Sequence, residues 1–406
     1  MTALATSVII VSRHRAADLV RCLCGLAQSD HPPMELVVVA DPAGIAAALA
    51  AGVGPIKTVG FDEANISAAR NLGIAAAAGA IVAFIDDDAV PEPSWLTRLT
   101  APFANPVVAA AGGFVRGRNG ISLQWQARVV DQTGVTRPLV VDDITPTLHK
   151  ATPDRAIKTE GTNMAVRRDV LLALGGFDAG FRFYLDETDL NLRLAQAGHT
   201  TAIVPLAQVH HGFAASPRRS AARVPLDLTD IGASTALFLR KHADPVHHAG
   251  ALSRLRSEQA SRLAKLRLPA GEIARLMAGL EAGIARRQTA DPVPLSPTPP
   301  PFLPLTGCGP KPWVLLSGWR HQGGRLRQQA MAETAAGKLA MVLLFSLTAR
   351  PHHLRFHPDG YWEQTGGLFG RSDRHGPTWH WFTRKTRVQA ECARLAPLRN
   401  LDPPGE

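Results

Sequence analysis

Three consecutive carboxylates end an apolar segment of this sequence. Residues 83–88 read Ala-Phe-Ile-Asp-Asp-Asp, and the apolar part has the composition of a buried strand. Neighbouring carboxylates repel one another unless a cation neutralises them. Mg²⁺ or Mn²⁺ held by one or two carboxylates keeps its other positions for water and for ligand phosphates. Asp86, Asp87 and Asp88 therefore predict a divalent-metal site for a nucleotide diphosphate, and a solvated acidic turn is the alternative.

A second acidic cluster, Asp186, Glu187 and Asp189, begins a segment with helical spacing. Helix N-termini favour anions, and helix capping by Asp186 accounts for one of these carboxylates. It does not account for Glu187, which is a candidate to take a proton from an acceptor hydroxyl in a site that partly excludes water. His210 and His211 follow a strand-like run and are candidates for a metal shell or a phosphate contact, because neutral imidazole suits Mn²⁺. A purely structural role for the two histidines is the alternative.

Four further polar residues suit contacts to a nucleotide. Asp41 ends a β-branched run and suits a uracil-like N–H or a ribose hydroxyl, although an Asp before Pro is also a common turn residue. Arg70 suits a ribose or a phosphate, although an Arg on a helix is commonly solvated or ion-paired. Arg218 and Arg219 are candidates for a flap over the bound nucleotide, or ordinary surface charges.

Strands and helices alternate through the first half of the chain. This alternation predicts a mostly parallel sheet covered by helices on both faces, with an irregular segment that ends near residue 158. Ligands of such sheets bind at the carboxyl ends of strands, where Asp41 and the acidic triplet fall. The expected strands are 7–12, 36–40, 81–85, 107–115, 162–166, 201–205 and 208–210, and the expected helices are 18–26, 47–51, 67–78, 95–103, 168–174 and 188–196.

The two halves of the chain differ in charge. Residues 1–213 carry a net charge of −3 and residues 214–406 carry +13, which together give the +10 of the whole chain. A basic half predicts a negatively charged partner, such as anionic lipid headgroups, a diphosphate-linked acceptor or nucleic acid. From about residue 226 to 288 the basic sequence is amphipathic. A helix packed on the first domain is favoured there over direct membrane contact.

Beyond this region, residues 291–312 are rich in Pro and predict an extended linker. Strands at 313–319 and 340–347, a helix at 326–336 and a hairpin at 354–362 then predict a small α/β module. The longest apolar runs are shorter than a membrane span, and the N-terminus has no signal-peptide pattern. The four cysteines have no metal-ligand spacing. We therefore expect a cytoplasmic protein, with peripheral contact at the inner face of the cell membrane as a further option.

The order of these motifs resembles that of family 2 glycosyltransferases over residues 5–213. The resemblance implies a Rossmann-like GT-A domain, a nucleotide diphosphate-sugar donor, Mn²⁺ or Mg²⁺, and inversion at the anomeric carbon. The motifs are Ser-Val-Ile-Ile-Val-Ser, Leu-Val-Val-Val-Ala-Asp, Asn-Ile-Ser-Ala-Ala-Arg-Asn-Leu-Gly, Phe-Ile-Asp-Asp-Asp-Ala-Val-Pro, Gly-Thr-Asn-Met-Ala-Val-Arg-Arg, Gly-Gly-Phe-Asp, Asp-Glu-Thr-Asp-Leu-Asn-Leu-Arg-Leu and Val-His-His.

By this resemblance the parts of the site can be assigned. Glu187 takes the position of the general base, with Asp186 as its alternate, because the family usually has Glu-Asp where this chain has Asp-Glu. The metal ligands are expected to be Asp88, Asp86 and His210. The residues expected on the donor side are Asp41, Arg70, Asp86 and Ser12.

The predicted organisation is a GT-A domain at 1–225, a basic helical region at 226–290, the linker at 291–312 and the small module at 313–406. The expected activity is metal-dependent transfer of a sugar, from a UDP-sugar in the first instance, to a glycan or lipid-linked acceptor of bacterial surface polysaccharide or lipopolysaccharide. The alternative is a non-catalytic glycan-binding or scaffolding protein. Nucleic-acid binding is not expected, because the aromatic positions match no familiar motif. A nucleotidyltransferase would need a Gly-rich, Lys-containing phosphate loop near the N-terminus, which this sequence lacks.

Overall fold

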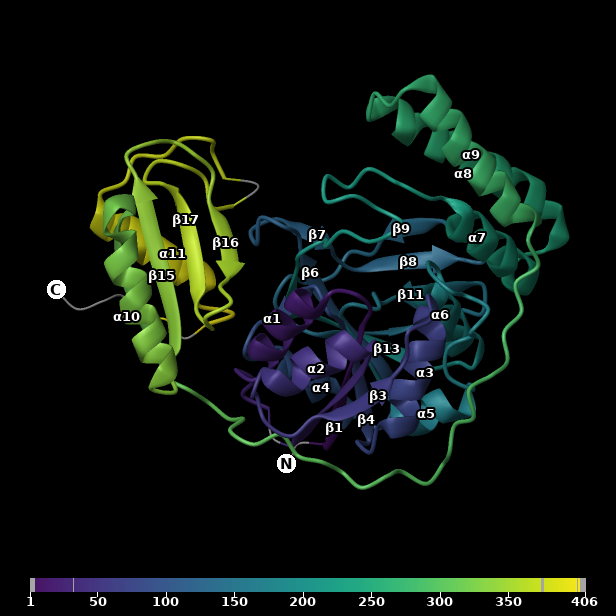
Figure 1. Cartoon of the computed structure of the whole chain (residues 1–406), viewed down its shortest axis with the longest axis horizontal. Coiled ribbons are helices and arrows are strands. Elements are labelled where there is room, and N and C mark those ends of the chain that lie inside the picture. Colours follow the sequence, from purple (N-terminus) through teal and green to yellow (C-terminus); the bar gives the residue numbers. More distant parts are fainter. Residues whose placement is uncertain (1–3, 32, 374–375, 400, 402–406) are drawn as a thin grey trace.

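A computed structural model describes residues 4–31, 33–373, 376–399 and 401 of the chain. A ten-stranded sheet lies at the centre of the N-terminal domain (Figure 1), in the order β10-β13-β6-β12-β4-β1-β2-β3 with β5 on β13 and β7 on β6. Its strands are β1 (Thr6–Ser12), β2 (Met34–Ala40), β3 (Lys57–Gly60), β4 (Ile81–Asp86), β5 (Ala89–Pro91), β6 (Val108–Arg116), β7 (Leu123–Trp125), β10 (Thr147–Lys150), β12 (Met164–Arg167) and β13 (Thr200–His211).

The strands β3, β2, β1 and β4 run parallel, as do β6 and β13. Only β12, β10 and the short strands β5 and β7 pair in the antiparallel sense. This arrangement confirms the predicted mixed α/β domain with a mostly parallel sheet, and it agrees with the expected GT-A class.

Helices cover both faces of this sheet. Since neighbouring strand residues point to opposite faces, the apolar residues of one strand pack against two helix layers. Val8 and Ile10 pack with Leu23 of one helix layer, whereas Ile9 packs with Ile74 of the other. The first layer is α1 (Ala16–Leu26), α2 (Pro42–Ala50) and α4 (Trp95–Thr100), and the second is α3 (Ile66–Ala76), α5 (Arg168–Ala173) and α6 (Asp186–Gln196).

A second, three-stranded sheet lies in the segment that the sequence predicts to be irregular. It consists of β8 (Arg128–Asp131), β9 (Thr136–Pro138) and β11 (Arg155–Lys158), in the order β11-β8-β9. Each strand has only three or four residues and much of the sheet is exposed, so the local sequence carries no clear alternation. This sheet places Lys158 over the end of the main sheet.

The basic helical region consists of α7 (Thr229–His242), α8 (His248–Lys265) and α9 (Ala270–Ala285). The apolar stripe of α8 packs against α9, where Leu255 and Leu263 are buried with Leu276 and Leu280. The helices therefore pack their apolar faces on one another and expose their basic faces. Within the described residues, no helix combines the length and the hydropathy that crossing a bilayer requires.

The Pro-rich segment is extended, as expected, but it is held against the N-terminal domain along much of its length. It runs along the lower edge of that domain in Figure 1. The Arg168 guanidinium donates to the carbonyls of Ser296 and Pro297 at 2.9 and 3.0 Å. The Leu305 amide donates to the Met34 carbonyl at 2.7 Å, and its side chain is buried in the core of the domain.

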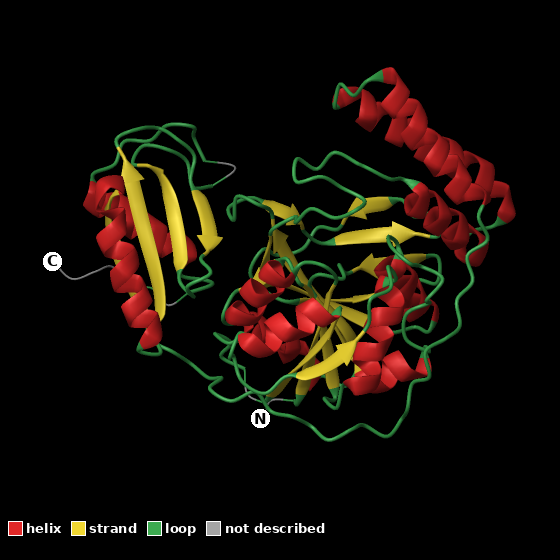
Figure 2. Cartoon of the chain, viewed as in Figure 1, coloured by secondary structure: helices red, strands yellow, loops and turns green. Residues whose placement is uncertain are grey.

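The C-terminal module is a four-stranded sheet with one helix on each face (Figure 2). Leu326 and Ala330 of α10 pack on one face, and Val388 and Cys392 of α11 pack on the other. The predicted strands, helix and hairpin of this module are confirmed. The elements are β14 (Trp313–Trp319), α10 (Gly323–Ala335), β15 (Leu339–Ser346), β16 (His353–Phe356), β17 (Trp362–Gly367) and α11 (Arg384–Leu395), in the sheet order β14-β15-β17-β16.

A fully buried ion pair, which we call the latch, joins this module to the N-terminal domain. Arg399 follows α11 and donates two hydrogen bonds to the Glu92 carboxylate, at 2.8 and 2.9 Å. The two side chains have no exposed surface. The His210 ring contacts the same carboxylate at 2.7 Å, and the guanidinium lies 4.0 Å from the centre of the Trp362 ring. Burial would raise the pKa of Glu92, but Arg399 and His210 outweigh it and hold that pKa well below its usual range.

Removing one partner of this buried pair should destabilise the protein strongly. We expect E92Q to lower the free energy of unfolding by about 3–5 kcal/mol, because it leaves the Arg399 charge buried without a counterion. Urea unfolding followed by tryptophan fluorescence measures this loss. R256Q is the matched control, because it breaks the exposed Arg256–Glu281 pair and should cost less than about 1 kcal/mol. Equal losses in the two variants would show that the latch contributes no more than a surface pair.

A buried histidine makes the stability of the module depend on pH. His352 contacts the side chains of Gln364 and Arg387 at 2.8 Å each, and burial together with the Arg387 charge lowers its pKa to about 4. Between pH 6.5 and 4 the unfolded chain therefore binds a proton that the folded chain excludes. The free energy of unfolding should therefore decrease as the pH is lowered from 6.5 to 4, by up to about 1.4 kcal/mol per pH unit from this one group. In H352Q this slope should be smaller, and an unchanged slope in urea titrations would contradict the assignment.

Candidate active site

A cavity of about 900 Å³ opens at the carboxyl ends of β1 and β4. It brings together nine of the residues that the sequence singles out, from five separate segments of the chain. The small sheet, the loop after β13 and helix α8 form its other walls. The nine residues are Ser12, Arg70, Asp86, Asp88, Asp186, Glu187, His211, Arg218 and Arg219.

A short strand pairing creates the acidic part of the cavity. The chain turns tightly after Asp86 and begins β5 at Ala89, which pairs with His211 of β13. This pairing places His211 Nε2 3.2 Å from Asp88 Oδ1 and 3.9 Å from Asp86 Oδ2. One ligand atom from each of the three residues lies within 4.8 Å of the others. Two carboxylates and an imidazole at this spacing fit a divalent cation such as Mn²⁺.

The structure brings His211 to this cluster and places His210 elsewhere. Successive side chains of a strand point to opposite faces, so the two histidines of β13 diverge. His210 faces Glu92 and Trp362 in the latch, where burial lowers its pKa to about 4. The sequence-based assignment of His210 as a metal ligand is therefore corrected to its neighbour.

The three aspartates of the triplet have different surroundings. Asp87 is fully buried and lies 2.5 Å from the Arg15 guanidinium, and burial raises its pKa to about 7. Asp88 is also buried, but contacts to His211, to Arg15 and to the Ala214 amide outweigh burial and hold its pKa well below its usual range. Asp88 in turn outweighs the burial of His211 and raises the pKa of that ring. Arg15 was not a sequence candidate, because it belongs to no motif and only the fold brings it under the triplet.

Arg70 links the two acidic clusters. Its guanidinium donates to Asp186 and lies 3.4 Å from Asp86 Oδ1, while its carbon lies 5.2 Å from the centre of the Phe177 ring. The side chain is almost completely buried. A Cβ on Gly161 would overlap this guanidinium, so a larger residue at that position would require Arg70 to shift. The structure thus places Arg70 between carboxylates, where it fixes their relative position.

The first two residues of α6 have opposite electrostatics. Burial raises the pKa of Asp186 to about 7, although Arg70 opposes this effect. Burial would also raise the pKa of Glu187, but the Lys158 ammonium, 2.9 Å away, outweighs it and lowers that pKa to about 2. Glu187 is therefore ionised at neutral pH. Lys158 was missed by sequence reasoning because its partner lies 29 residues away and on a different element.

The backbone before α6 carries strain. Tyr184 and Leu185 both have positive φ angles, of 71° and 65°, which side chains other than glycine rarely adopt. Such strain persists only where the surroundings hold it in place, and it is common at functional sites.

Two of the sequence motifs hold this strained segment in position. The Asn71 side chain exchanges two hydrogen bonds with the backbone of Phe177, and the Ser67 hydroxyl donates to the Phe181 carbonyl at 2.6 Å. Asp189, the third carboxylate of the second cluster, contacts His242 and Lys241 of α7 at 2.8 Å each. These residues position the site without lining it.

Asp41 is the predicted donor-side residue that lies outside the cavity lining. It caps α2, and its carboxylate accepts from the amides of His14 and Gly44 at 2.8 and 3.4 Å. Burial would raise the pKa of Asp41, but these amides outweigh it and lower that pKa. The geometry is that of the turn residue that the sequence offered as the alternative.

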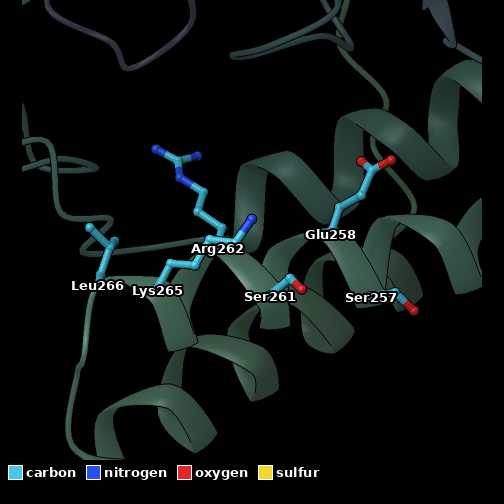
Figure 3. Close-up of a pocket in the computed structure, with 6 residues that line it drawn as sticks. All are labelled: Ser257, Glu258, Ser261, Arg262, Lys265 and Leu266. Atoms are coloured by element: carbon cyan, nitrogen blue, oxygen red, sulfur yellow. The ribbon is translucent and has the colours of Figure 1, made fainter.

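Arginines surround the mouth of the cavity. The guanidinium carbons of Arg219 and Arg223 lie 5.4 and 4.2 Å from the centre of the Phe213 ring, which stacks on His211. Arg218 pairs instead with Asp230 at 2.5 Å. On α8, Glu258 and Arg262 border both the cavity and an adjacent depression. Figure 3 shows these two side chains extending to the same side of the helix. The other residues of the depression are Ser257, Ser261, Lys265 and Leu266.

Comparison with solved structures gives distant neighbours. GalNAc-T7 with UDP, GalNAc and Mn²⁺ is 17% identical, with a TM-score of 0.46 over 69% of this chain and 54% of that chain. The mannosyltransferase PcManGT of Pyrobaculum calidifontis with GDP-Man and Mn²⁺ is 19% identical, with a TM-score of 0.44 over 68% of this chain and 85% of that chain.

Two characterised relatives match part of the chain. The O-antigen biosynthesis protein RfbC of Myxococcus xanthus is 28% identical over 226 residues, which are 52% of this chain and 18% of that protein. The pre-mycofactocin glycosyltransferase of Mycobacterium tuberculosis is 29% identical over 182 residues, which are 44% of this chain and 36% of that protein. This chain therefore spans well under half the length of each relative.

The family model described as glycosyltransferase like family 2 matches residues 4–225. This range contains β1 to β13, the cluster of Asp86, Asp88 and His211, and the Asp186–Glu187 pair, and it is more than half of the 406 residues. The chain belongs to the glycosyltransferase family 2-like proteins.

Proposed function

We propose that this protein transfers a sugar from a nucleotide diphosphate-sugar to an acceptor hydroxyl, with inversion at the anomeric carbon. The observation that carries the proposal is a single cavity that holds both a two-carboxylate, one-imidazole cluster and an ionised carboxylate, Glu187, at a strained helix start. Family membership supports the same chemistry.

Asp86, Asp88 and His211 are the residues that we propose to hold a divalent cation, Mn²⁺ or Mg²⁺. When bound, such an ion stabilises the negative charge that develops on the leaving diphosphate. The chain itself holds these ligands in place and keeps Asp88 ionised. Arg15 and Arg70 compensate the charge of the aspartates from below and from the side, and the Ala214 amide donates to Asp88 at 2.7 Å.

We propose Glu187 as the general base that accepts the proton of the acceptor hydroxyl. Its ion pair with Lys158 keeps it ionised, and its side chain still has 17% of its surface exposed toward the cavity. Asp186 is the weaker candidate, because it is buried and its carboxylate is occupied by the Arg70 guanidinium. Ser12 lines the donor side of the same cavity.

We propose a negatively charged glycan or a lipid-linked diphosphate as the acceptor, in the synthesis of a bacterial surface polysaccharide. Arg223 and Arg262 at the mouth have no carboxylate within ion-pair distance among the described residues, so they suit an anionic substrate. The name of the Myxococcus relative supports a cell-surface polysaccharide as the product.

The metal assignment predicts a clear difference between the two histidines. In the wild-type protein Mn²⁺ alone should raise the melting temperature, because a ligand that binds only the folded state stabilises it. We expect D88N and H211Q to lose most of this shift. H210Q, the matched control on the same strand, should melt at a lower temperature without Mn²⁺ but keep the shift. A shift that is lost in H210Q and kept in H211Q would restore the assignment made from the sequence.

The proposed base predicts a separation of binding from chemistry. E187Q should reduce sugar transfer by about 10²–10⁴-fold, because general base catalysis contributes on that scale. It should keep the thermal shift that a nucleoside diphosphate gives with Mn²⁺, and a screen of UDP, GDP, dTDP and CMP identifies the nucleotide. E258Q is the matched control at the cavity mouth and should retain transfer within a fewfold range. Full transfer by E187Q would remove Glu187 from the mechanism, and no shift with any nucleotide in the wild type would remove the proposed donor.

A further inference from the structure

Large apolar side chains are exposed together at one end of the C-terminal module. Leu347 is 71% exposed, Trp381 70% and Trp379 53%. Exposed apolar residues that are scattered singly are ordinary, but a contiguous patch marks an interaction site. Leu347 lies in the loop between β15 and β16, and the two tryptophans lie in the loop between β17 and α11.

Backbone hydrogen bonds bring these two loops together. The Phe369 amide donates to the Thr348 carbonyl at 3.1 Å, and the Leu368 amide donates to the Ser346 carbonyl at 2.8 Å. Phe369 then stacks on Trp381 with their ring centres 5.3 Å apart, and Trp379 lies 5.9 Å from Trp381. We call this patch the apolar tip; its residues are Leu347, Phe369, Trp379 and Trp381.

Three arginines belong to the segments that carry the apolar tip. Arg350 and Arg371 lie in the same two loops, and Arg384 begins α11 directly after them, and all three are exposed. Within the part of the chain that the structure describes, none of the three has a carboxylate within ion-pair distance. Exposed apolar and indole side chains on loops that also carry arginines have the composition of a surface that enters the headgroup region of an anionic bilayer.

The composition of the tip fits a bilayer better than a sugar chain. Tryptophan stacks on sugar rings as well, but glycan sites also need planar amide or carboxylate side chains that bind several hydroxyls. The described residues of the two loops, 347–352 and 368–373 with 376–383, contain no Asn, Gln or Glu and only one Asp. Leu347, the most exposed residue of the tip, has neither a hydrogen-bonding group nor a ring for a sugar, whereas its side chain suits the edge of the acyl chains.

The basic helices, where the sequence placed a membrane contact as the less favoured option, have no comparable surface. Leu255 and Leu263 of α8 are buried against α9, so the apolar face of this amphipathic helix is already covered. In Figure 1 the two loops that carry the tip lie at the upper end of the module. Helix α8, which borders the cavity mouth, lies on the same upper side of the molecule.

We propose that the apolar tip docks the protein on an anionic membrane surface, with Trp379, Trp381 and Leu347 in the interfacial region and the nearby arginines on the phosphate headgroups. The contact is a property of the module and does not depend on the reaction proposed for the N-terminal domain.

Co-sedimentation of the full chain with vesicles tests this proposal without any nucleotide or acceptor. We expect binding to vesicles of equal parts phosphatidylglycerol and phosphatidylcholine, and weaker binding in high salt because the arginine attraction is screened. The double variant W379S/W381S should bind at least about tenfold more weakly, since each indole removed from the interface loses burial of apolar surface. Its melting temperature should change little, because both rings are more than half exposed.

Three controls test whether the tip itself makes the membrane contact. V140S removes another exposed apolar side chain, 95% exposed and outside the tip, and should bind like the wild type. R350Q/R371Q/R384Q should lose the preference for anionic over neutral vesicles. Brominated phosphatidylcholine in the vesicles should quench tryptophan fluorescence in the wild type more than in W379S/W381S. The proposal is overturned if the wild type does not sediment with anionic vesicles, if W379S/W381S sediments equally, or if soluble dextran and not brominated lipid changes the fluorescence of these tryptophans.

Discussion

Negative charge at the end of β4 has to be neutralised inside a largely buried site, and much of the structure follows from this constraint. Three aspartates in a row would repel one another in a medium that screens poorly. Each aspartate contacts a basic side chain: Asp87 contacts Arg15, Asp88 contacts His211 and Asp86 contacts Arg70. Two of the carboxylates, Asp86 and Asp88, line the cavity, and it is these two that we propose to hold a cation.

Strand β13 connects this site to the C-terminal module. His211 turns toward the aspartates, and His210, one residue earlier, turns toward the Glu92–Arg399 latch. The same short ladder with β5 therefore carries a site residue on one face and an interface residue on the other. The Pro-rich segment adds a second connection, since it is bonded along the lower edge of the N-terminal domain before it enters β14. The module is thus joined to the N-terminal domain by the latch and by the bonded Pro-rich segment.

Charge also distinguishes the two carboxylates at the start of α6. They are neighbours in the chain, but Asp186 is buried against Arg70 and Glu187 reaches the cavity beside Lys158. Burial favours the protonated form of the first, and the ammonium favours the ionised form of the second. Two neighbouring carboxylates therefore have different roles: Asp186 is a positioning residue and Glu187 is a candidate base.

The sequence alone determined six strands of the main sheet, β1, β2, β4, β6, β12 and β13, and the edge at which its polar residues collect, because β-branched runs, helical spacing and strand-terminal aspartates are local patterns. It did not predict the short strands β3, β5, β7 and β10 of the same sheet. It determined much less for β8, β9 and β11, which are too short to show a period. Only the tertiary structure decided which histidine meets Asp88. The pairing of β13 with β6 contains register shifts, so the face to which His210 or His211 points cannot be found by counting alternate residues from the start of the strand. The roles of Arg15, Lys158 and Arg399 could not be predicted from the sequence either, since each residue acts through a partner that is distant in sequence or belongs to no motif. A pattern within one element predicts that element, whereas a contact between elements depends on how they pack, and packing is a property of the whole chain.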